Sequence, residues 1–380
     1  MTRPSAVWRW FRRPAEGPLL SVVVPVYDVV DYLPASLDSI LRQPVSDFEL
    51  LVVDDGSTDG SAAVLADYAR RDPRFRVLTQ ENAGQSVARN RAVAQARGEF
   101  LTFVDPDDEL PADAWGSMLA TLRRTRSDFV VGNVERVEGE RRFTTPLMAR
   151  NHTEDRLRLR IEDRPLMLAD VFVWNKIFRR SFWVEHGITF PEGVRYEDQV
   201  ALTQAFLAAD RFDVLSEVVY EWRVREDRSS ATQKRAQLAN LVERFDTKQQ
   251  TAAMVREYGE PRVLDVLYRE VLPVDMKVTF GAAASLDGEP AAAYWEVLRD
   301  GMRALWREDT VPWVDVRLGV ALRLLGWLVL QDRHDDFRRL WDLVEADAVP
   351  VEDNRYRHPW YHEPGLPEAL RVFRRTPPTG

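Results

Sequence analysis

The chain has 380 residues, of which 45% are hydrophobic and 30% charged, which is ordinary for a globular protein and long enough for two domains. A net charge of −9 and a pI near 5.3 argue against nucleic acid as a partner. Cysteine is absent, which excludes disulfides, thiolate metal sites and a cysteine nucleophile and is compatible with a reducing cytoplasm.

The start of the chain and its longest apolar run bear on where in the cell the protein is located. Residues 1–18 include several basic residues but no apolar segment of the kind found in secretory signals. The run at 320–330 is too short to span a bilayer and contains Arg323. We therefore expect a cytoplasmic protein. Residues 7–13 mix aromatic residues with arginines, which fits either a tail that packs or stays disordered, or a peripheral anchor on the inner face of the cell membrane.

Strand and helix patterns alternate along the first third of the chain. A near-continuous β-branched run predicts a strand at 21–26, and further apolar segments predict strands at 48–53, 76–78 and 99–104. Apolar residues at helical spacing predict helices at 33–41, 61–70 and 86–96. This alternation predicts an α/β fold with a mostly parallel, Rossmann-like sheet, whose ligands bind at the carboxyl ends of the strands.

The pattern changes twice further along the chain. Residues 130–232 are mixed, with short strands predicted at 129–131 and 218–220 and a charged loop at 156–164. Helical patterns then dominate at 238–245, 263–271, 294–306 and 316–330. We expect a tail at 1–18, a catalytic α/β domain at 19–234, an α-helical domain at 235–350 and a tail or linker at 351–380. The helical domain could form a homo-oligomer, bind an anionic polymer or dock on a membrane, and its pattern does not choose among these.

An acidic cluster follows the fourth predicted strand, at Asp105-Pro106-Asp107-Asp108-Glu109. Carboxylate oxygens suit Mg²⁺ or Mn²⁺, which keep open positions for substrate phosphates. Pro106 ends the strand and stiffens the turn. A solvated acidic turn is the alternative. The metal site is favoured because the cluster comes after a strand end and downstream of the Asp54-Asp55 turn.

Five motifs occur in order over the first 230 residues. They are VPVY at 24–27, VVDDGSTD at 52–59, ENAGQSVARN at 81–90, DPDD at 105–108 and YED at 196–198. Together they resemble family 2 glycosyltransferases of the GT-A fold. WNKIF at 174–178 also resembles the branch that acts on wall teichoic-acid-type or capsular polymers.

The resemblance implies a metal-dependent, inverting glycosyltransferase. It would use Mn²⁺ or Mg²⁺ to move a sugar from a nucleotide-sugar, with a UDP-sugar favoured, to a hydroxyl of a cell-envelope polymer or its lipid-linked precursor. The acceptor could be a polyol-phosphate or a glycan. Two alternatives stay open: a CDP- or dTDP-activated donor, and an inactive GT-A scaffold that binds polymer or a partner chain.

The first three motifs carry the predicted nucleotide site. Pro25 and Tyr27 would offer a flat, apolar wall to a nucleobase, and Asp55 can accept a hydrogen bond from a uracil imide N–H. The alternative is that Asp54 or Asp55 caps the following turn. The resemblance favours Asp55 as the ligand and places Asn82 in the same site. Gly84 lets its loop approach the nucleotide closely.

The resemblance also gives roles to the charged residues that follow. Arg89 could reach the base or a phosphate, although an arginine on an amphipathic helix is usually a surface residue. Asp107 would hold the cation that bridges the diphosphate, and Asp105 would contact the ribose or reach the metal through water. Pro106 stands where family members often have a small residue, which puts little in doubt because its side chain coordinates nothing.

Inverting transfer needs a base for the acceptor hydroxyl. Asp198, paired with Glu197, matches the family's base; the alternative is an acid pair at a helix N-terminus. Further contacts with acceptor, donor sugar or phosphate are expected from Trp174, Asn175, Lys176, Arg225 and Ser229. For Trp174, core packing is an equal alternative. No histidine stands where some relatives carry a metal ligand, and His358 and His362 are expected to pack or lie at the surface.

Overall fold

The computed structural model describes residues 17–224, 237–307, 309–349, 351–352, 355–356, 358–360 and 362–371. The N-terminal aromatic and basic segment and the predicted contacts Arg225 and Ser229 lie outside these residues. The chain divides into two compact units, one formed by residues up to 163 together with 170–226, the other by 164–169 together with the chain from 227 onward. Each unit is described by itself.

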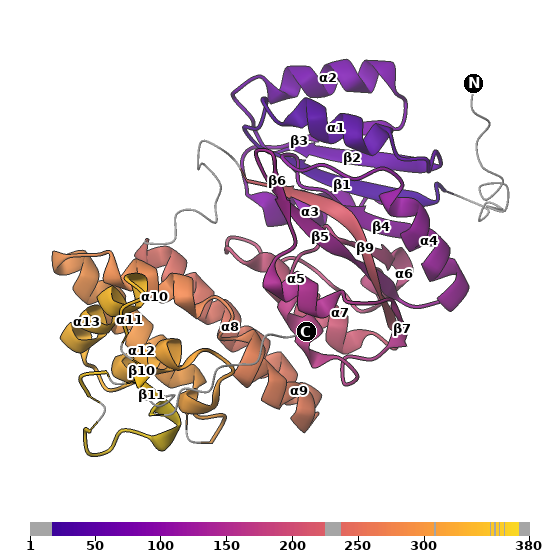
Figure 1. The fold of residues 1–380 in the computed structure, drawn as a ribbon. Coiled ribbons are helices and arrows are strands. Elements are labelled where there is room, and N and C mark those ends of the chain that lie inside the picture. The colour runs from indigo at the N-terminus through magenta and orange to yellow at the C-terminus, as the bar shows by residue number, and fades with distance from the viewer. Residues whose placement is uncertain are drawn as a thin grey trace. The chain divides into compact units, whose positions relative to one another are not determined.

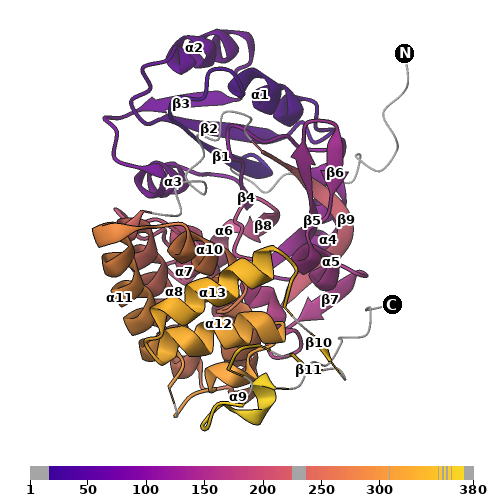
Figure 2. The ribbon, with the colours of Figure 1, turned by 60° about the vertical axis from the view of Figure 1, so that its left-hand side comes forward.

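The first half of the first unit is a parallel sheet. Its strands are β1 (Leu20–Val26), β2 (Phe48–Asp54), β3 (Phe75–Thr79) and β4 (Phe100–Phe103), in the order β3-β2-β1-β4. The connecting helices are α1 (Leu33–Leu41), α2 (Ser61–Arg71) and α3 (Gln85–Val93). Figures 1 and 2 show α1 and α2 over one face of these strands and α3 over the other. The predicted alternation of parallel strands and helices is confirmed, with helices on both faces of the sheet and β1, β2 and β4 buried at every position.

The sheet continues as a mixed sheet. The further strands are β5 (Phe129–Glu138), β6 (Arg141–Phe143), β7 (Arg156–Leu159), β8 (Lys176–Arg179) and β9 (Phe212–Arg223). Strand β8 runs antiparallel to both β4 and β5, whereas β9 runs parallel to β5. The remaining helices are α4 (Ala114–Thr125), α5 (Pro146–Asn151), α6 (Arg180–Glu185) and α7 (Glu197–Ala208).

One prediction for this part was wrong, and two predicted strands are present but longer than expected. The segment 156–159, predicted as loop, forms β7, which pairs with β9 at the end of the sheet. The strands predicted at 129–131 and 218–220 extend to 10 and 12 residues. In both cases charged or polar residues interrupt the apolar pattern, because these strands have residues that stay partly exposed.

Pro25 lies within β1, where a missing N–H would normally break the ladder. The Val104 N–H donates to the Val23 carbonyl, so Val23 faces β4. Pro25, two residues further on, faces the same side. The register with β4 ends at the Val23–Phe103 pair. The proline therefore costs no ladder bond and lies in the sheet just beyond the end of β4.

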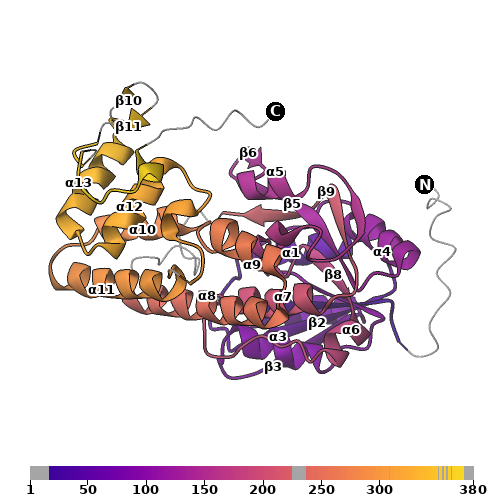
Figure 3. The same cartoon turned by 90° about the horizontal axis from the view of Figure 1, so that it is seen from below.

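The second unit is helical. Its elements are η2 (Pro165–Ala169), α8 (Leu238–Tyr258), α9 (Pro261–Val266), the π-helix η4 (Leu267–Val271), α10 (Met276–Ala284), α11 (Gly288–Leu305), η5 (Trp313–Asp315), α12 (Val320–Leu330), α13 (His334–Glu345), β10 (Val351–Glu352), β11 (Arg355–Tyr356) and η6 (Glu368–Leu370). Helices α8 and α11 lie side by side (Figure 3), and a Cβ on Gly301 would lie only 2.5 Å from the Phe245 ring.

The C-terminal segment of this unit contributes to its core, since Trp360, Leu366 and Leu370 are buried and η6 packs against α12 and η5. Among the residues described, no helix is long and apolar enough to span a bilayer.

Gly132 in β5 offers a test of this packing. A Cβ there would lie 2.3 Å from Val219 Cγ2 and 2.5 Å from Cγ1 on the neighbouring strand β9. We expect Gly132→Ala to lower the free energy of unfolding by about 1–3 kcal/mol through overpacking. Adding Val219→Ala removes the clashing methyl groups, so the double variant should lose less than the sum of the two single losses in urea unfolding. Additive losses would contradict this packing.

Candidate active site

The acidic turn after β4 is fixed by β9. The Asp105 N–H donates to the Tyr220 hydroxyl at 3.0 Å, and that hydroxyl donates to Asp108 Oδ2, also at 3.0 Å. The Arg223 N–H donates to Asp108 Oδ1 at 2.8 Å. Asp108 and Tyr220 are buried, whereas Asp105 and Asp107 are partly exposed. The turn therefore uses Asp108 as an internal anchor and leaves Asp105 and Asp107 beside the open edge of the sheet.

Arg89 on α3 forms ion pairs with three carboxylates of the site. Its Nη2 donates to Asp105 Oδ1 at 2.8 Å, and its Nη1 lies 2.6 Å from Asp198 Oδ1 and 3.2 Å from Glu197 Oε1. The side chain is 1% exposed, and its guanidinium lies 5.2 Å from the Phe190 ring centroid. The guanidinium is enclosed and directed at these three acids, and its contact with base or phosphate stays a prediction.

Glu197 and Asp198 are the first two residues of α7. The residue before them, Tyr196, has φ of 62°, a left-handed conformation that side chains other than glycine seldom adopt. Such strain persists only where the surroundings enforce it. The left-handed conformation of Tyr196 directs the chain into α7. Glu197 and Asp198, which are 108 and 109 residues after Arg89 in the sequence, thereby reach its guanidinium.

The carboxylates around Arg89 hold protons more tightly than free carboxylates. Burial raises the pKa of Asp198 to about 7 and outweighs the opposing effect of Arg89, and the Glu197 charge raises it further. Burial likewise raises the pKa of Asp105 to about 6 against Arg89, with a further contribution from Asp107. Burial raises the pKa of Glu197 too. One guanidinium does not balance three partly buried acids.

The two acids at the end of β2, Asp54 and Asp55, have different tasks. Asp54 Oδ1 accepts the Ser57 N–H at 3.0 Å, so Asp54 caps the turn. Asp55 fixes the next loop: its Oδ1 accepts from Gln80 Nε2 at 2.7 Å and from the Ala83 N–H at 2.9 Å, and its Oδ2 accepts the Gly84 N–H at 2.8 Å. Asp55 Oδ2 retains acceptor capacity for a further donor.

Asn82 and Gly84 lie exposed in the loop that Asp55 holds. Gly84 has φ of 93° at the start of α3, and a Cβ there would meet nothing within 4 Å. Its glycine is therefore required by backbone conformation rather than by a close approach within the protein.

Tyr27 follows β1 and is 48% exposed. The next residues are tied to the turn after β2, since Asp28 Oδ1 accepts the Thr58 N–H at 2.7 Å and the Val29 N–H donates to Ser61 Oγ at 3.2 Å. An exposed ring thus stands on a fixed backbone at the same edge of the sheet as Asp55. Pro25 is buried within β1.

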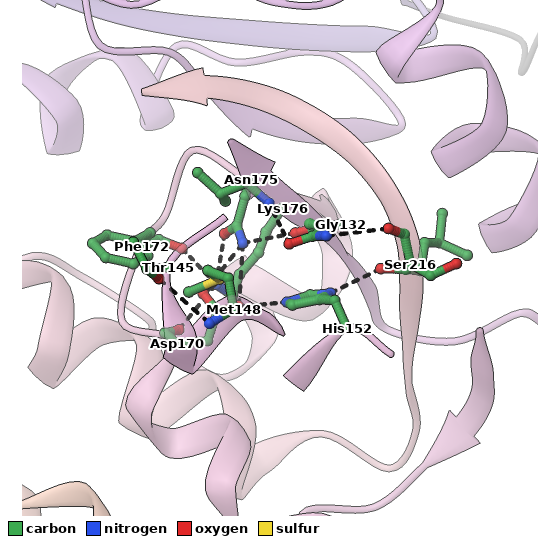
Figure 4. Close-up of polar contacts among 12 residues, drawn as sticks. Gly132, Thr145, Met148, His152, Asp170, Phe172, Asn175, Lys176 and Ser216 are labelled. Carbon is green, nitrogen blue, oxygen red and sulfur yellow. Dashed lines mark hydrogen bonds and ion pairs between the residues drawn. The ribbon is translucent and has the colours of Figure 1, made fainter. Parts of the chain in front are cut away.

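The WNK segment before and within β8 is internal. Trp174 stacks on Tyr220 with ring centroids 4.0 Å apart and on Phe172 at 4.7 Å. Asn175 and Lys176 are fully buried, and their side chains bond Gly132 and Asp170 (Figure 4). The predicted contact of these two residues with acceptor or phosphate does not fit this placement, because their polar atoms are satisfied inside the protein.

Sequence reasoning missed Asp170, His152 and the Tyr220 hydroxyl as parts of this region. A signal was available for Asp170, because Lys176 stands in the apolar run 171–178 and a buried lysine requires an acidic partner. Nothing in the sequence indicates which acid that is.

The comparisons with known proteins define the class. A sequence model described as glycosyl transferase family 2 matches residues 21–183. The uncharacterized glycosyltransferase EpsJ of Bacillus subtilis is 31% identical over 253 residues, which is 64% of this chain and 71% of EpsJ. The chain therefore belongs to glycosyl transferase family 2. A poly(ribitol-phosphate) beta-glucosyltransferase of Bacillus spizizenii is 30% identical over 215 residues, 55% of this chain and 32% of that protein.

A solved structure supports the fold. Residues 1–349 of S. aureus TarS, in complex with UDP-GlcNAc, match with a TM-score of 0.71 at 22% identity, covering 89% of this chain and 95% of that chain. This likeness confirms the predicted GT-A fold and the helical region after it.

The raised pKa values give a prediction about stability. When the pKa of a carboxyl is higher in the folded than in the unfolded state, the free energy of unfolding of the protein falls as the pH rises from about 4 through the folded pKa. We expect Asp198→Asn to remove this loss and to be about 1–3 kcal/mol more stable than the wild type at pH 8, with little difference near pH 4. Thermal unfolding at both pH values measures it. Glu81→Gln, at an exposed acid of the same unit, serves as control; equal pH dependence in Asp198→Asn and wild type would contradict the prediction.

Proposed function

We propose that this glycosyltransferase moves a sugar from a nucleotide-sugar, most simply a UDP-sugar, to a hydroxyl of a cell-envelope polymer, with Asp198 as the base. The support for the polymer comes from relatives: one is named for poly(ribitol-phosphate), and TarS was solved with UDP-GlcNAc. The acceptor class covers polyol-phosphate, glycan and lipid-linked precursors. Location in the cytoplasm or at the inner face of the membrane stays a prediction.

The observation that carries the proposal is the convergence on Arg89. It joins Asp105, at the strand end where the donor is expected, to Glu197 and Asp198 on α7. Donor binding and base thus belong to one electrostatic unit. A base works best when its pKa is near the working pH, and burial raises the pKa of Asp198 to about 7. An inactive scaffold would need no carboxyl adjusted in this way.

In this mechanism the chain's own residues bind, orient and accept a proton. Tyr27 lies against the nucleobase, and Asp55 Oδ2 accepts an N–H from it. Asp198 takes the proton of the acceptor hydroxyl as that oxygen attacks the anomeric carbon from the face opposite the diphosphate. Arg89 orients Asp198 and remains charged throughout, because a guanidinium keeps its proton at any working pH.

The donor chemistry of the turn fits a divalent cation that is shared with the substrate. Over the described residues, no three or more His, Asp or Glu side chains are grouped to hold a metal by themselves. Mg²⁺ and Mn²⁺ commonly use one or two carboxylates and complete their shell with phosphates and water. Asp107 would supply the protein ligand, and the cation would neutralise charge on the departing nucleoside diphosphate.

Asp198→Asn provides the test of the base. We expect kcat for UDP release from the preferred UDP-sugar to fall about 100- to 10,000-fold, because the amide cannot accept the proton. The dissociation constant for UDP should change little, since Asp198 does not contact the nucleotide in this proposal. A coupled assay of UDP release with several UDP-sugars and Mn²⁺ or Mg²⁺, together with calorimetry for UDP, measures both.

An unchanged kcat in Asp198→Asn would overturn its role as base. The absence of turnover by the wild type with UDP-, CDP- and dTDP-sugars alike would favour the scaffold alternative. Turnover only with a CDP- or dTDP-sugar would retain the enzyme and change the donor.

Asp107→Ala tests the cation site. We expect Mn²⁺ to strengthen UDP binding to the wild type and to have at most a small effect on the variant, because the protein ligand is lost. Glu109→Gln removes the same charge from the same turn, but its carboxylate pairs with Arg42 and Arg223, so the Mn²⁺ effect should persist. Calorimetric titration of UDP with and without Mn²⁺ decides; equal Mn²⁺ dependence in Asp107→Ala and wild type would contradict the assignment.

A further inference from the structure

Lys176 and Asp170 form a buried ion pair. Lys176 Nζ is 2.7 Å from Asp170 Oδ1, and both side chains have no exposed surface (Figure 4). Burial acts to raise the pKa of Asp170, but Lys176 and His152 outweigh it and hold that pKa below its usual range, so the carboxyl is ionised. Removing one partner of such a pair is costly, yet burying the pair brings little net stability. A purely structural role therefore explains its presence poorly.

The ammonium also shapes the backbone around it. Lys176 Nζ donates to the carbonyl of Asp170 at 3.0 Å, to the carbonyl of Phe172 at 2.5 Å and to Asn175 Oδ1 at 2.8 Å. Residues 170–172 have no regular secondary structure. Lys176 therefore fixes the backbone conformation of this loop by donating to the carbonyls of Asp170 and Phe172. Without such a donor, carbonyls buried in a loop would lack hydrogen bonds.

The next backbone amide reaches the base. The Val173 N–H belongs to the same peptide as the Phe172 carbonyl that Lys176 binds, and hydrogen bonding from this amide acts to lower the pKa of Asp198, against the larger effect of burial. Lys176 also contacts α7, with its Nζ 5.7 Å from the ring centroid of Phe206, and its positive charge acts to lower the pKa of Asp198. Lys176 thus acts on Asp198 in two ways, through the Val173 amide that it places and through its own charge.

Asp170 is itself held from several strands. His152 Nε2 lies 3.1 Å from Asp170 Oδ2, and His152 Nδ1 lies 2.8 Å from the Leu215 carbonyl on β9. Asn175 Nδ2 donates to the Gly132 carbonyl on β5 at 2.9 Å and to Asp170 at 3.2 Å. Figure 4 shows these contacts converging on the Asp170–Lys176 pair, which is therefore anchored to the sheet and fixed in position.

We propose that Lys176, held by Asp170, is a positioning residue for Asp198: it folds residues 170–172 around its ammonium so that the Val173 amide holds and orients the base. The proposal rests on Asp198 being the base of the proposed reaction. It gives the WNK segment a task that needs no contact with substrate, which agrees with the complete burial of Asn175 and Lys176.

The expected direction follows from the groups that face Asp198. Arg89 from α3, Lys176 from β8 and the Val173 amide favour its ionised form, whereas Glu197 on α7 and Asp105 after β4 oppose it. Loss of the Lys176 charge and of the Val173 hydrogen bond both favour the protonated form. The Asp198 carboxyl should then titrate at higher pH, and a base that is protonated at higher pH loses activity at higher pH.

The experiment compares Lys176→Met with the wild type. The readouts are the carboxyl ¹³C NMR titration of Asp198, assigned with Asp198→Asn, and the pH dependence of kcat for UDP release. We expect the Asp198 titration and the acidic limb of kcat to move upward by about one pH unit. The dissociation constant for UDP should stay within about twofold, because no atom of the network contacts the donor.

Lys248→Met is the matched control. Lys248 is also a buried lysine, with its Nζ 2.6 Å from the Leu272 carbonyl and 2.8 Å from Asp275 Oδ1 in the helical unit. Its loss should lower thermal stability and leave the Asp198 titration in place. If Lys176→Met does not fold, the double variant with Asp170→Asn, which leaves no unpaired charge, takes its place and should show an upward shift of the same sign.

The outcomes separate the two proposals. An Asp198 titration and an acidic limb that match the wild type in a folded Lys176 variant overturn the positioning role, as does an equal shift in Lys248→Met. Absence of turnover by the wild type with every donor overturns the proposed function instead, and the NMR titration still reports whether Lys176 acts on Asp198.

Discussion

The Arg89 guanidinium is the interaction on which the site depends. A buried charge persists only if it is paired, and Arg89 meets this condition by binding three acids from two places in the sequence, Asp105 and the adjacent pair Glu197 and Asp198. The turn after β4, the start of α7 and α3 are thereby locked to one another. Because the three acids outnumber the one cation, the cluster keeps an excess of negative charge that burial makes unfavourable. Such a site takes up protons or binds cations, and both are useful to an enzyme that must accept a proton and stabilise a departing diphosphate.

The excess of negative charge around Arg89 lowers the stability of the folded protein in the state that the proposed function requires. The raised pKa of Asp198 means that the folded state favours the protonated carboxyl, so the ionised form that the proposed mechanism needs is maintained at a cost in folding free energy. Tyr196 adds backbone strain at the residue that begins α7. Neither feature would be expected in a segment selected for stability alone. Both lie where the proposed chemistry occurs, which is the usual location for tolerated strain.

The parts of this structure that the sequence predicts are those governed by local pattern. Strands β1, β2 and β4 are buried at every position, so their apolar runs identify them without knowledge of the fold. Strand β7 has only four residues, two of them arginine, and lies in a charged segment predicted as a loop. Contacts between distant residues follow a different rule. The sequence places Arg89 on a helix and Asp198 at a helix start, but nothing local indicates that they meet across 109 residues. For the same reason Lys176, in an apolar run, could be recognised as needing a buried acid but not as contacting Asp170.

Two buried cations, Arg89 and Lys176, act on Asp198 in the proposed mechanism, and their chemistry explains why one is arginine and the other lysine. Arg89 must join acids that arrive from different directions, and a planar fork with separate nitrogens can bind Asp105 and Asp198 at once. Lys176 must gather one carboxylate and several carbonyl oxygens of a single short loop, which suits a compact ammonium with rotatable donors. Exchanging the two residue types would keep both charges and lose both geometries. The orientation of Asp198 therefore depends on the shape of its cationic neighbours as well as on their charge.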